Sequence, residues 1–317
     1  MSRAAPRPPL GVRLVYGLRP QPDFAALSDE ELAELGRAQN EVVTSPAARL
    51  ITGCPALGSR VTWTTVALTD RQIPVRVHRP RRSGTGPLPL VLHVHGGGYS
   101  GTAVQCDWLT SHLAARLPAV VVSVEHRLLG PGVSMAAAAD DVLSTLVQVW
   151  EHASTWGVDP DRVALVGESA GGTMTALAAE RSPRLRAQVL VNPCLDLTAA
   201  ALDYPSMTEH AHTPTISAAE VQRFCRLAAP AGTDARAVSP LTRAETATLP
   251  STLLVVPGLD PLADQARTYA ARVRPTQTPV RLLEIERAGH AFLSMPHLVP
   301  SAYRARRAIC SFLHAAL

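Results

Sequence analysis

The sequence predicts an α/β fold: a mostly parallel sheet with helices on both faces, plus a small helical cap. From residue 88 onward, short apolar runs alternate with longer helical stretches, a pattern typical of parallel strands joined by helices. The interval 196–235 interrupts this alternation and is too long for a bare connection. We therefore expect it to lie over the carboxyl ends of the strands, where ligands bind in such sheets.

Two edge strands and six central strands are predicted. Alternating polar and apolar residues over 61–69 and 73–79 predict an antiparallel hairpin at a sheet edge. The apolar runs predicted as central strands are Leu88–Val94, Ala119–Val124, Arg162–Val166, Ala187–Val191, Thr252–Val256 and Val280–Ile285. The helical stretches are expected near 105–117, 135–156, 170–181, 261–273 and 298–316, with a further helix beginning at about Ser217.

Residues 1–55 are expected to contribute to the cap, while 56–317 form the main domain and include the excursion at 196–235. Residues 1–22 are rich in proline and arginine, so they are expected to follow the surface or to stay partly disordered. Ser28, followed three residues later by Glu31, predicts a capping box and the start of an amphipathic helix.

Composition indicates a globular protein, with 46% hydrophobic and 18% charged residues among 317. The sequence contains no run of about 18 apolar residues, so no membrane-spanning helix is predicted. Arg13 interrupts the apolar core that a signal peptide would need, which favours a cytoplasmic protein. The densest basic group, Arg79, Arg81 and Arg82, is interpreted as a solvated loop, so no nucleic-acid partner is expected. Five cysteines without a Cys-x-x-Cys pair argue against a disulfide scaffold and a zinc site.

One stretch leads from an apolar strand directly into a helix: Val163-Ala-Leu-Val-Gly-Glu-Ser-Ala-Gly-Gly172. Gly167 and Gly171 suit a strained turn whose tip leaves no room for side chains beside it. Ser169, at that tip, is the candidate nucleophile. Because glycine-rich turns are common, the pattern gains weight only if the chain also supplies a base, an acid and donors for an oxyanion.

Three further loops lie at the carboxyl ends of predicted strands. In His95-Gly-Gly-Gly-Tyr99, consecutive glycines let backbone N–H groups face a reacting carbonyl. Asp260 and Asp264 follow a later strand, and His290 follows the last one. The order Ser169, aspartate, histidine is the order in which this kind of fold presents a nucleophile, an acid and a base.

The other polar residues near these loops have simpler interpretations. Asp260 fits a helix N-cap before Pro261, a role compatible with catalysis. Asp264 lies one turn further on and is expected to brace the loop.

Histidine pairs occur twice outside these positions. His93 and His95 form a His-x-His expected to place both rings on one strand face, but no further ligand is spaced to complete a metal site. His210 and His212 are interpreted as surface residues of the excursion. We therefore expect neither a metal nor a cofactor.

At these residues the chain resembles the hormone-sensitive-lipase-like family of α/β-hydrolase carboxylesterases, over about residues 60–317. The paired motifs His-Gly-Gly-Gly and Gly-Glu-Ser-Ala-Gly-Gly make the resemblance specific. It implies the α/β-hydrolase fold, with Ser169 as nucleophile, Asp260 as acid and His290 as base. The oxyanion donors that it implies are the backbone N–H groups of Gly97, Gly98 and Ala170.

Some segments depart from the family pattern. Glu125-His-Arg-Leu-Leu-Gly-Pro131 stands where Asp-Tyr-Arg-Leu-Ala-Pro-Glu is usual, and Gly132–Met135 replaces an aromatic and proline run. His-Ala-Phe also replaces the usual His-Gly-Phe at 290–292. Because the segment at 125–135 is expected to border the active site, it bears on the substrate class and leaves the three candidate residues intact.

The function predicted from these residues is hydrolysis of a small-molecule carboxylic ester through an acyl-enzyme. Two alternatives stay open. The same site would also suit acyl transfer, cyclisation or deacylation of a bulky natural-product intermediate. In another class, the protein would be a non-catalytic receptor for a small ligand, for which loss of the serine or the histidine is expected. The sequence leaves the oligomeric state open, a homodimer included.

Overall fold

The computed structural model describes residues 7–17, 22–244 and 248–317. Its main sheet has eight strands in the order β1-β2-β4-β3-β5-β6-β9-β10. β2 runs antiparallel to β1 and β4, and every pair from β4 to β10 is parallel. The strands are β1 (Ser59–Ala67), β2 (Gln72–Pro80), β3 (Leu88–Val94), β4 (Val120–Val124), β5 (Val158–Glu168), β6 (Ala187–Val191), β9 (Ser251–Leu259) and β10 (Val280–Gly289).

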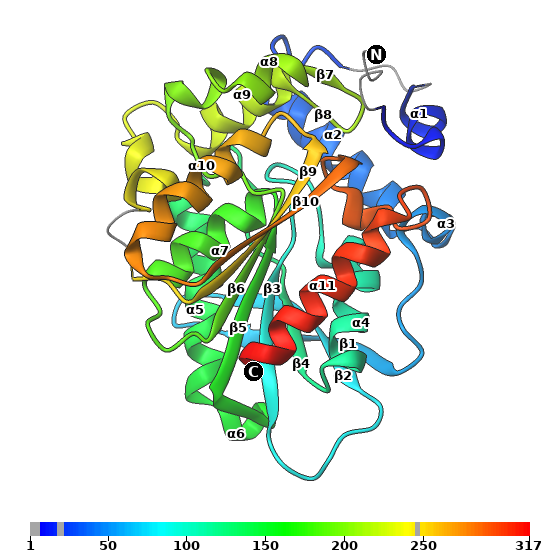
Figure 1. Cartoon of the computed structure of the whole chain (residues 1–317), viewed down its shortest axis with the longest axis vertical. Coiled ribbons are helices and arrows are strands. Elements are labelled where there is room, and N and C mark those ends of the chain that lie inside the picture. The colour runs from blue at the N-terminus through cyan, green and yellow to red at the C-terminus, as the bar shows by residue number, and fades with distance from the viewer. Residues whose placement is uncertain (1–6, 18–21, 245–247) are drawn as a thin grey trace.

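Helices cover both faces and one end of this sheet (Figure 1). The α-helices are α1 (Leu10–Gly17), α2 (Asp29–Thr44), α3 (Arg49–Thr52), α4 (Asp107–Arg116), α5 (Met135–Glu151), α6 (Ala153–Trp156), α7 (Ala170–Glu180), α8 (Pro205–Glu209), α9 (Ala218–Ala228), α10 (Ala263–Val273) and α11 (Ser301–Ala316). The 3-10 helices are η1 (Pro46–Ala48), η2 (Ala103–Cys106), η3 (Ala199–Leu202), η4 (Ala235–Val238), η5 (Pro240–Arg243), η6 (Arg274–Thr276) and η7 (Phe292–Ser294). None of the described helices is long and apolar enough to cross a membrane.

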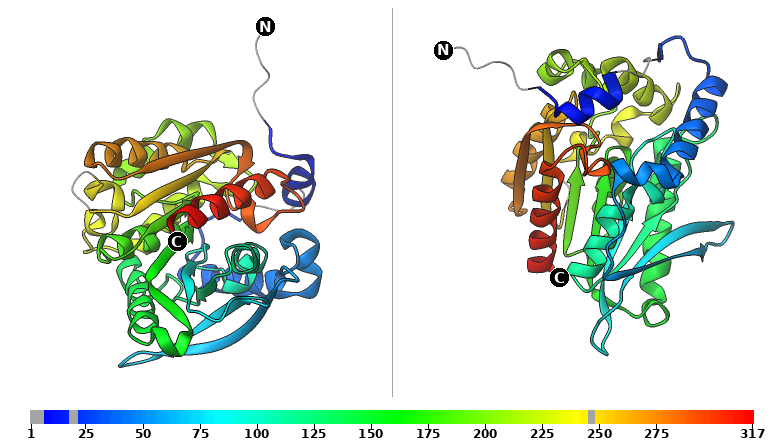
Figure 2. Two further views of the ribbon diagram at one scale, coloured as in Figure 1. Left: turned by 60° about the horizontal axis from the view of Figure 1, so that its bottom comes forward. Right: turned by 90° about the vertical axis from the view of Figure 1, so that its right-hand side faces the viewer.

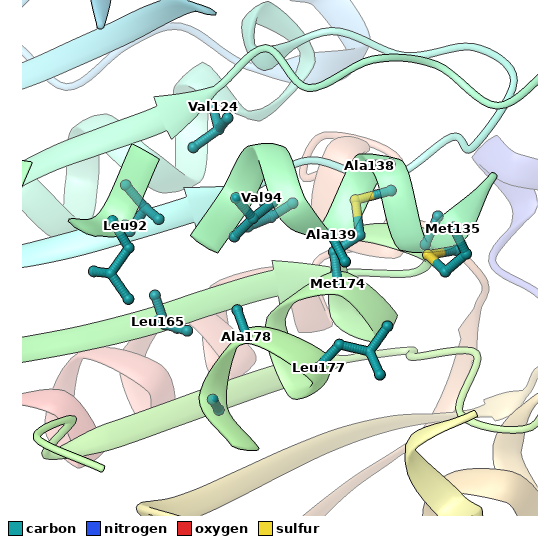
Figure 3. Packing of buried hydrophobic residues seen from close by; sticks show 14 of the residues in the cluster. Leu92, Val94, Val124, Met135, Ala138, Ala139, Leu165, Met174, Leu177 and Ala178 are labelled. Atoms are coloured by element: carbon teal, nitrogen blue, oxygen red, sulfur yellow. The ribbon is translucent and has the colours of Figure 1, made fainter. Parts of the chain in front are cut away.

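Alternate residues of the central strands pack into hydrophobic cores on opposite faces of the sheet. Leu92 and Val94 of β3 pack with α5 and α7 on one face, while Val91 packs with α4 and α11 on the other. Figure 3 shows the first of these cores, in which side chains from β3, β4 and β5 meet those from α5 and α7. Since both faces are buried, the strands read as continuous apolar runs.

The excursion at 196–235 and the N-terminal helices gather at one end of the sheet, as both views of the ribbon show (Figures 1 and 2). Within the excursion lie α8, α9 and a small hairpin of β7 (His212–Thr213) and β8 (Ile216–Ser217). Ser217 caps α9, so the helix predicted from Ser217 is confirmed. The capping box of Ser28 and Glu31 at the start of α2 is also confirmed.

α2 is attached to the loop that follows the three glycines after β3. The Asn40 side chain accepts a hydrogen bond from the N–H of Gly101 at 2.7 Å and donates to its carbonyl oxygen at 3.3 Å. Gly36 of α2 faces the carbonyl oxygen of Tyr99 so closely that an added Cβ would lie 2.6 Å from it. The N-terminal helix therefore covers the glycine loop.

The predicted fold class, the edge hairpin and the six central strands are confirmed, and the differences are local. β5 starts earlier than predicted, at Val158, because an irregular stretch of the pairing adds a contact with Leu88. The helix predicted over 135–156 is interrupted at His152 and ends before Gly157, which adopts a left-handed conformation with φ 61°.

The expectation for residues 1–22 is wrong over part of that range. α1 forms at Leu10–Gly17 and buries Val12 in the core beside α11. A methyl group on Gly11 would lie 3.1 Å from Leu298, so the helix also contacts the segment before α11. The helix was not predicted because the prolines and arginines around Leu10, Val12 and Leu14 favoured an irregular segment, although these three residues are apolar. The parts of that range at 1–6 and 18–21 lie outside the described residues.

Leu165 on β5 tests the core between the sheet and α7. Its side chain is fully buried, so Leu165→Ala is expected to lower the free energy of unfolding by about 2–5 kcal/mol through lost apolar contacts and a residual cavity. Chemical denaturation of the variant measures this change. Leu57→Ala is the control, because Leu57 is 93% exposed and its truncation is expected to change stability by less than about 0.5 kcal/mol.

Candidate active site

Ser169 lies at a sharp turn between β5 and α7. Its backbone has φ 54° and ψ −120°, which is strained for a residue with a side chain, and its N–H donates to the carbonyl oxygen of Val191 at 2.9 Å. A Cβ on Gly171 would overlap the carbonyl oxygens of Val94 and His95, and one on Gly167 would overlap Thr175. The two glycines thus allow the close packing that holds the turn, for the reason expected from sequence.

Ser169, His290 and Asp260 form one hydrogen-bonded chain. His290 Nε2 lies 2.8 Å from Ser169 Oγ, and His290 Nδ1 lies 2.8 Å from Asp260 Oδ2. Asp260 is completely buried and its other oxygen accepts the N–H of Leu262 at 2.9 Å. A buried carboxylate with these partners fixes the orientation of the imidazole.

The two aspartates of the loop after β9 have different partners. α10 begins at Ala263, so the prediction that Asp260 caps a helix starting at Pro261 is wrong: Asp260 closes a turn before the helix. Asp264 accepts the N–H of Ser206 at 2.8 Å, which ties α10 to α8. Asp264 therefore braces the excursion, in keeping with its expected role.

Opposing effects act on the pKa of His290. Burial lowers it, but the charge and the hydrogen bond of Asp260, together with the charges of Glu220 and Glu168, raise it above the usual value. Since Glu220 belongs to α9, the excursion places a negative charge near this histidine.

The glycines after β3 lie beside the serine because β3 and β5 are neighbouring strands. A methyl group on Gly96 would lie 3.0 Å from the Cβ of Ser169. Gly97 has φ 119°, a conformation that favours glycine. Within the described part of the chain, the hydrogen bonds leave the N–H groups of Gly97, Gly98 and Ala170 without a protein acceptor. These are the groups that the family resemblance implied as oxyanion donors.

The unusual segment after β4 supports this glycine loop. His126 Nε2 lies 3.2 Å from the carbonyl oxygen of His95, and the N–H of Leu129 donates to the carbonyl oxygen of Gly98 at 2.9 Å. The rings of His95 and His126 stack with centroids 4.2 Å apart. The segment that was expected to border the active site thus contacts its glycine loop.

The His-x-His pair does not act as one unit. His95 lies beyond the end of β3 and stacks on His126, whereas His93 bonds Ser123 Oγ at 2.8 Å and Glu168 Oε1 at 3.3 Å. Glu168 and Cys106 each bring a ligand-type atom to within 4.8 Å of that of His93. Sequence spacing did not reveal this group, because its members come from three separate elements.

A cavity of about 520 Å³ opens onto Ser169 and His290. Its walls are mostly apolar and come from the glycine loop, α2, α9 and the segments around them. Phe224 of α9 packs on Gly98, where an added Cβ would lie 2.7 Å from the ring. None of the described lining residues comes from 125–135.

The excursion at 196–235 was expected to lie over the site, but the individual residues that α9 contributes were not predicted. Glu220 and Tyr99 both line the cavity, and the Tyr99 hydroxyl donates to Glu220 Oε1 at 2.6 Å. Asn192 lies at the other side, its Nδ2 3.5 Å from His290 Nε2. The sequence predicted the helix start at Ser217, but only the tertiary fold brings Glu220 and His290 to the same cavity.

Comparison with known proteins identifies the family. Residues 91–294 match the alpha/beta hydrolase fold family. The carboxylesterase NlhH of Mycobacterium tuberculosis is 33% identical over 250 residues, which cover 75% of this chain and 76% of that protein. The ethyl acetate hydrolase of Pseudomonas putida is 30% identical over 252 residues, covering 75% and 77%.

Solved structures share the whole architecture. An esterase from Pyrobaculum calidifontis, 25% identical, superposes with a TM-score of 0.83 over 98% of this chain and 99% of that one. A thermostable esterase from Pseudomonas putida, 22% identical, gives 0.85 over 99% of both chains and shows the fold alone.

The chain belongs to the α/β-hydrolase family. Within it, the predicted resemblance to the hormone-sensitive-lipase-like carboxylesterases is confirmed, and the protein is an ester hydrolase of the carboxylesterase type.

Glu220→Gln is expected to shift the pH dependence of turnover. The Glu220 charge favours the protonated imidazole, so removing it lowers the pKa of His290 and leaves more neutral base at acidic pH. The acidic limb of kcat/KM against pH for a neutral ester should therefore move to lower pH. An unchanged limb would show that Glu220 does not influence His290. Glu209→Gln, an exposed acid on α8, is the control.

Proposed function

We propose that Ser169, His290 and Asp260 hydrolyse carboxylic esters through an acyl-enzyme. Ser169 Oγ attacks the ester carbonyl while His290 Nε2 takes its proton, and Asp260 stabilises the imidazolium. Collapse of the tetrahedral intermediate breaks the C–O bond, and His290 returns the proton to the leaving alcohol. Water then repeats the sequence on the acyl-serine and releases the acid.

The observation that carries the proposal is the pair of 2.8 Å contacts that His290 makes, one with Ser169 and one with Asp260. A histidine that already contacts both an acid and a hydroxyl is arranged for proton transfer before a substrate binds. It also weighs against the non-catalytic receptor, which has no use for this arrangement.

The oxyanion donors in this proposal are the N–H groups of Gly97, Gly98 and Ala170. They are held at the loop after β3 and at the start of α7, so they need no rearrangement when charge develops on the carbonyl oxygen. Each such donor contributes on the order of 3 kcal/mol to transition-state stabilisation.

The alternative reaction, acyl transfer or cyclisation of a bulky intermediate, rested on the segment at 125–135. That segment supports the glycine loop and supplies none of the described cavity lining, so it gives no reason to prefer the alternative. Simple ester hydrolysis is therefore the function that we favour.

We extend the proposal to the organisation and location of the protein. Residues 1–55 and 196–235 would form the cap, since α2 and α9 both line the cavity above the main domain at 56–317. A cytoplasmic location is supported by five free cysteines, one of them, Cys54, exposed. Light scattering would measure whether the protein forms a homodimer.

Ser169→Ala is expected to lower the turnover of a p-nitrophenyl ester by about 10⁶-fold, because the nucleophile is lost. A fluorophosphonate probe should label the parent protein and leave this variant unlabelled. Circular dichroism controls for folding. Activity retained by a folded Ser169→Ala protein would contradict the assignment of the nucleophile.

Simple ester hydrolysis and the specialised reaction on a bulky intermediate predict different substrate profiles. For a hydrolase with an apolar cavity of about 520 Å³, we expect turnover of short and medium p-nitrophenyl esters without an added acyl acceptor. Product analysis with and without alcohol acceptors measures this. Turnover restricted to large acylated scaffolds, or dependent on an acceptor, would favour the specialised reaction.

A further inference from the structure

We propose that Glu220 makes this protein selective for esters that carry a cationic group, such as a quaternary ammonium, within a few ångströms of the scissile bond. The inference rests on the proposed function and specifies its substrate class. Three observations support it: Glu220 lines the cavity, its hydrogen-bond partners are neutral, and no arginine occurs among the described lining residues.

Glu220 belongs to the first turn of α9 and is half-buried. It lines the same cavity as Ser169 and His290, and its charge raises the pKa of His290. A substrate bound in this cavity would therefore meet its carboxylate on the side formed by the excursion.

The hydrogen bonds to Glu220 leave its charge uncompensated. Oε1 accepts the Tyr99 hydroxyl at 2.6 Å, and the backbone N–H of Ser217 also lies within reach of the carboxylate. Both partners are neutral. Arg223, the nearest arginine along α9, forms its ion pair with Asp29 of α2. Within the described part of the chain, no ion pair involves Glu220.

The cavity lining carries two acidic side chains, and the basic side chain among its described residues is His290. Among the described residues that line it, Glu168 and Glu220 are the carboxylates and no arginine occurs. This contrasts with the whole chain, which has 30 basic residues and a net charge of +4. Glu168 is already bonded to His93 at the base of the site, so Glu220 is the carboxylate available to a ligand.

A cation of the substrate would offset the cost of keeping this carboxylate among apolar groups. Phe224 and Val221 of the same helix and Leu35 of α2 line the same cavity and contribute to its mostly apolar walls. Burial raises the pKa of Glu220, because apolar surroundings disfavour the charged form of the carboxyl group. An anionic substrate would face repulsion there, and a neutral one would leave the charge unpaired.

A purely structural role for Glu220 makes a different prediction. If Glu220 only held Tyr99 and the start of α9 in place, its substitution would change the rates for all substrates alike. A glutamine at this position keeps the length of the side chain and an oxygen for the Tyr99 hydroxyl, while removing the charge. The ratio of rates for cationic and neutral esters therefore separates recognition from support.

The experiment compares matched esters of equal shape and different charge. For the alcohol side, butyrylcholine is paired with 3,3-dimethylbutyl butyrate. For the acyl side, the p-nitrophenyl ester of 4-(trimethylammonio)butyrate is paired with that of 5,5-dimethylhexanoate. We expect the parent enzyme to give a kcat/KM at least about tenfold higher for the cationic member of one pair, and Glu220→Gln to remove that preference.

Glu209→Gln serves as the matched control, because it removes an exposed charge of the excursion outside the cavity and should leave the ratio unchanged. Equal rates for both members of both pairs in the parent enzyme would overturn the proposal, as would a preference that persists in Glu220→Gln. Ser169-dependent turnover of the neutral esters tests the proposed function separately, so the two failures are distinguishable.

Discussion

The rest of the site depends on the backbone conformation of Ser169, which has a positive φ and is not a glycine. Such a conformation persists only where the surrounding structure enforces it. Here the enforcement comes from both sides: Gly171 packs on the end of β3, and the Ser169 N–H is bonded to the end of β6. The strain is thus held by the sheet itself, and the hydroxyl is fixed relative to every loop that leaves the same edge.

Three carboxylates of the site differ in the groups that bond to them. Asp260 has no exposed surface, yet its charge is matched by one imidazole and one backbone N–H. Glu168, the residue before Ser169, is bonded to His93. Glu220 has neutral partners alone and lies at the cavity wall. The protein itself supplies the partners of Asp260 and Glu168. The electrostatic environment of Glu220, in contrast, depends on what the cavity contains.

The sequence was most informative where local chemistry and strand order decide the structure. The turn at Gly167–Gly171, the glycines at 96–98 and the two capping serines could be predicted because each pattern has a local physical cause. What could not be predicted depends on distant pairs, such as Glu220 with Tyr99 or Phe224 with Gly98, since α9 reaches the glycine loop only through the tertiary fold. α1 was missed for a related reason: a helix of eight residues is stabilised by burying Val12 against the other terminus, and its own sequence gives a weak signal.

The contact between Phe224 and Gly98 has a consequence for exchanging caps between relatives. The helix that shapes the space for the substrate also lies against the backbone proposed to receive the negative charge of the intermediate. A transplanted cap whose aromatic ring sat differently would move that backbone as well as the cavity wall. In this architecture, a change in the proposed cap would be expected to alter both the substrate selectivity and the rate of the chemical step.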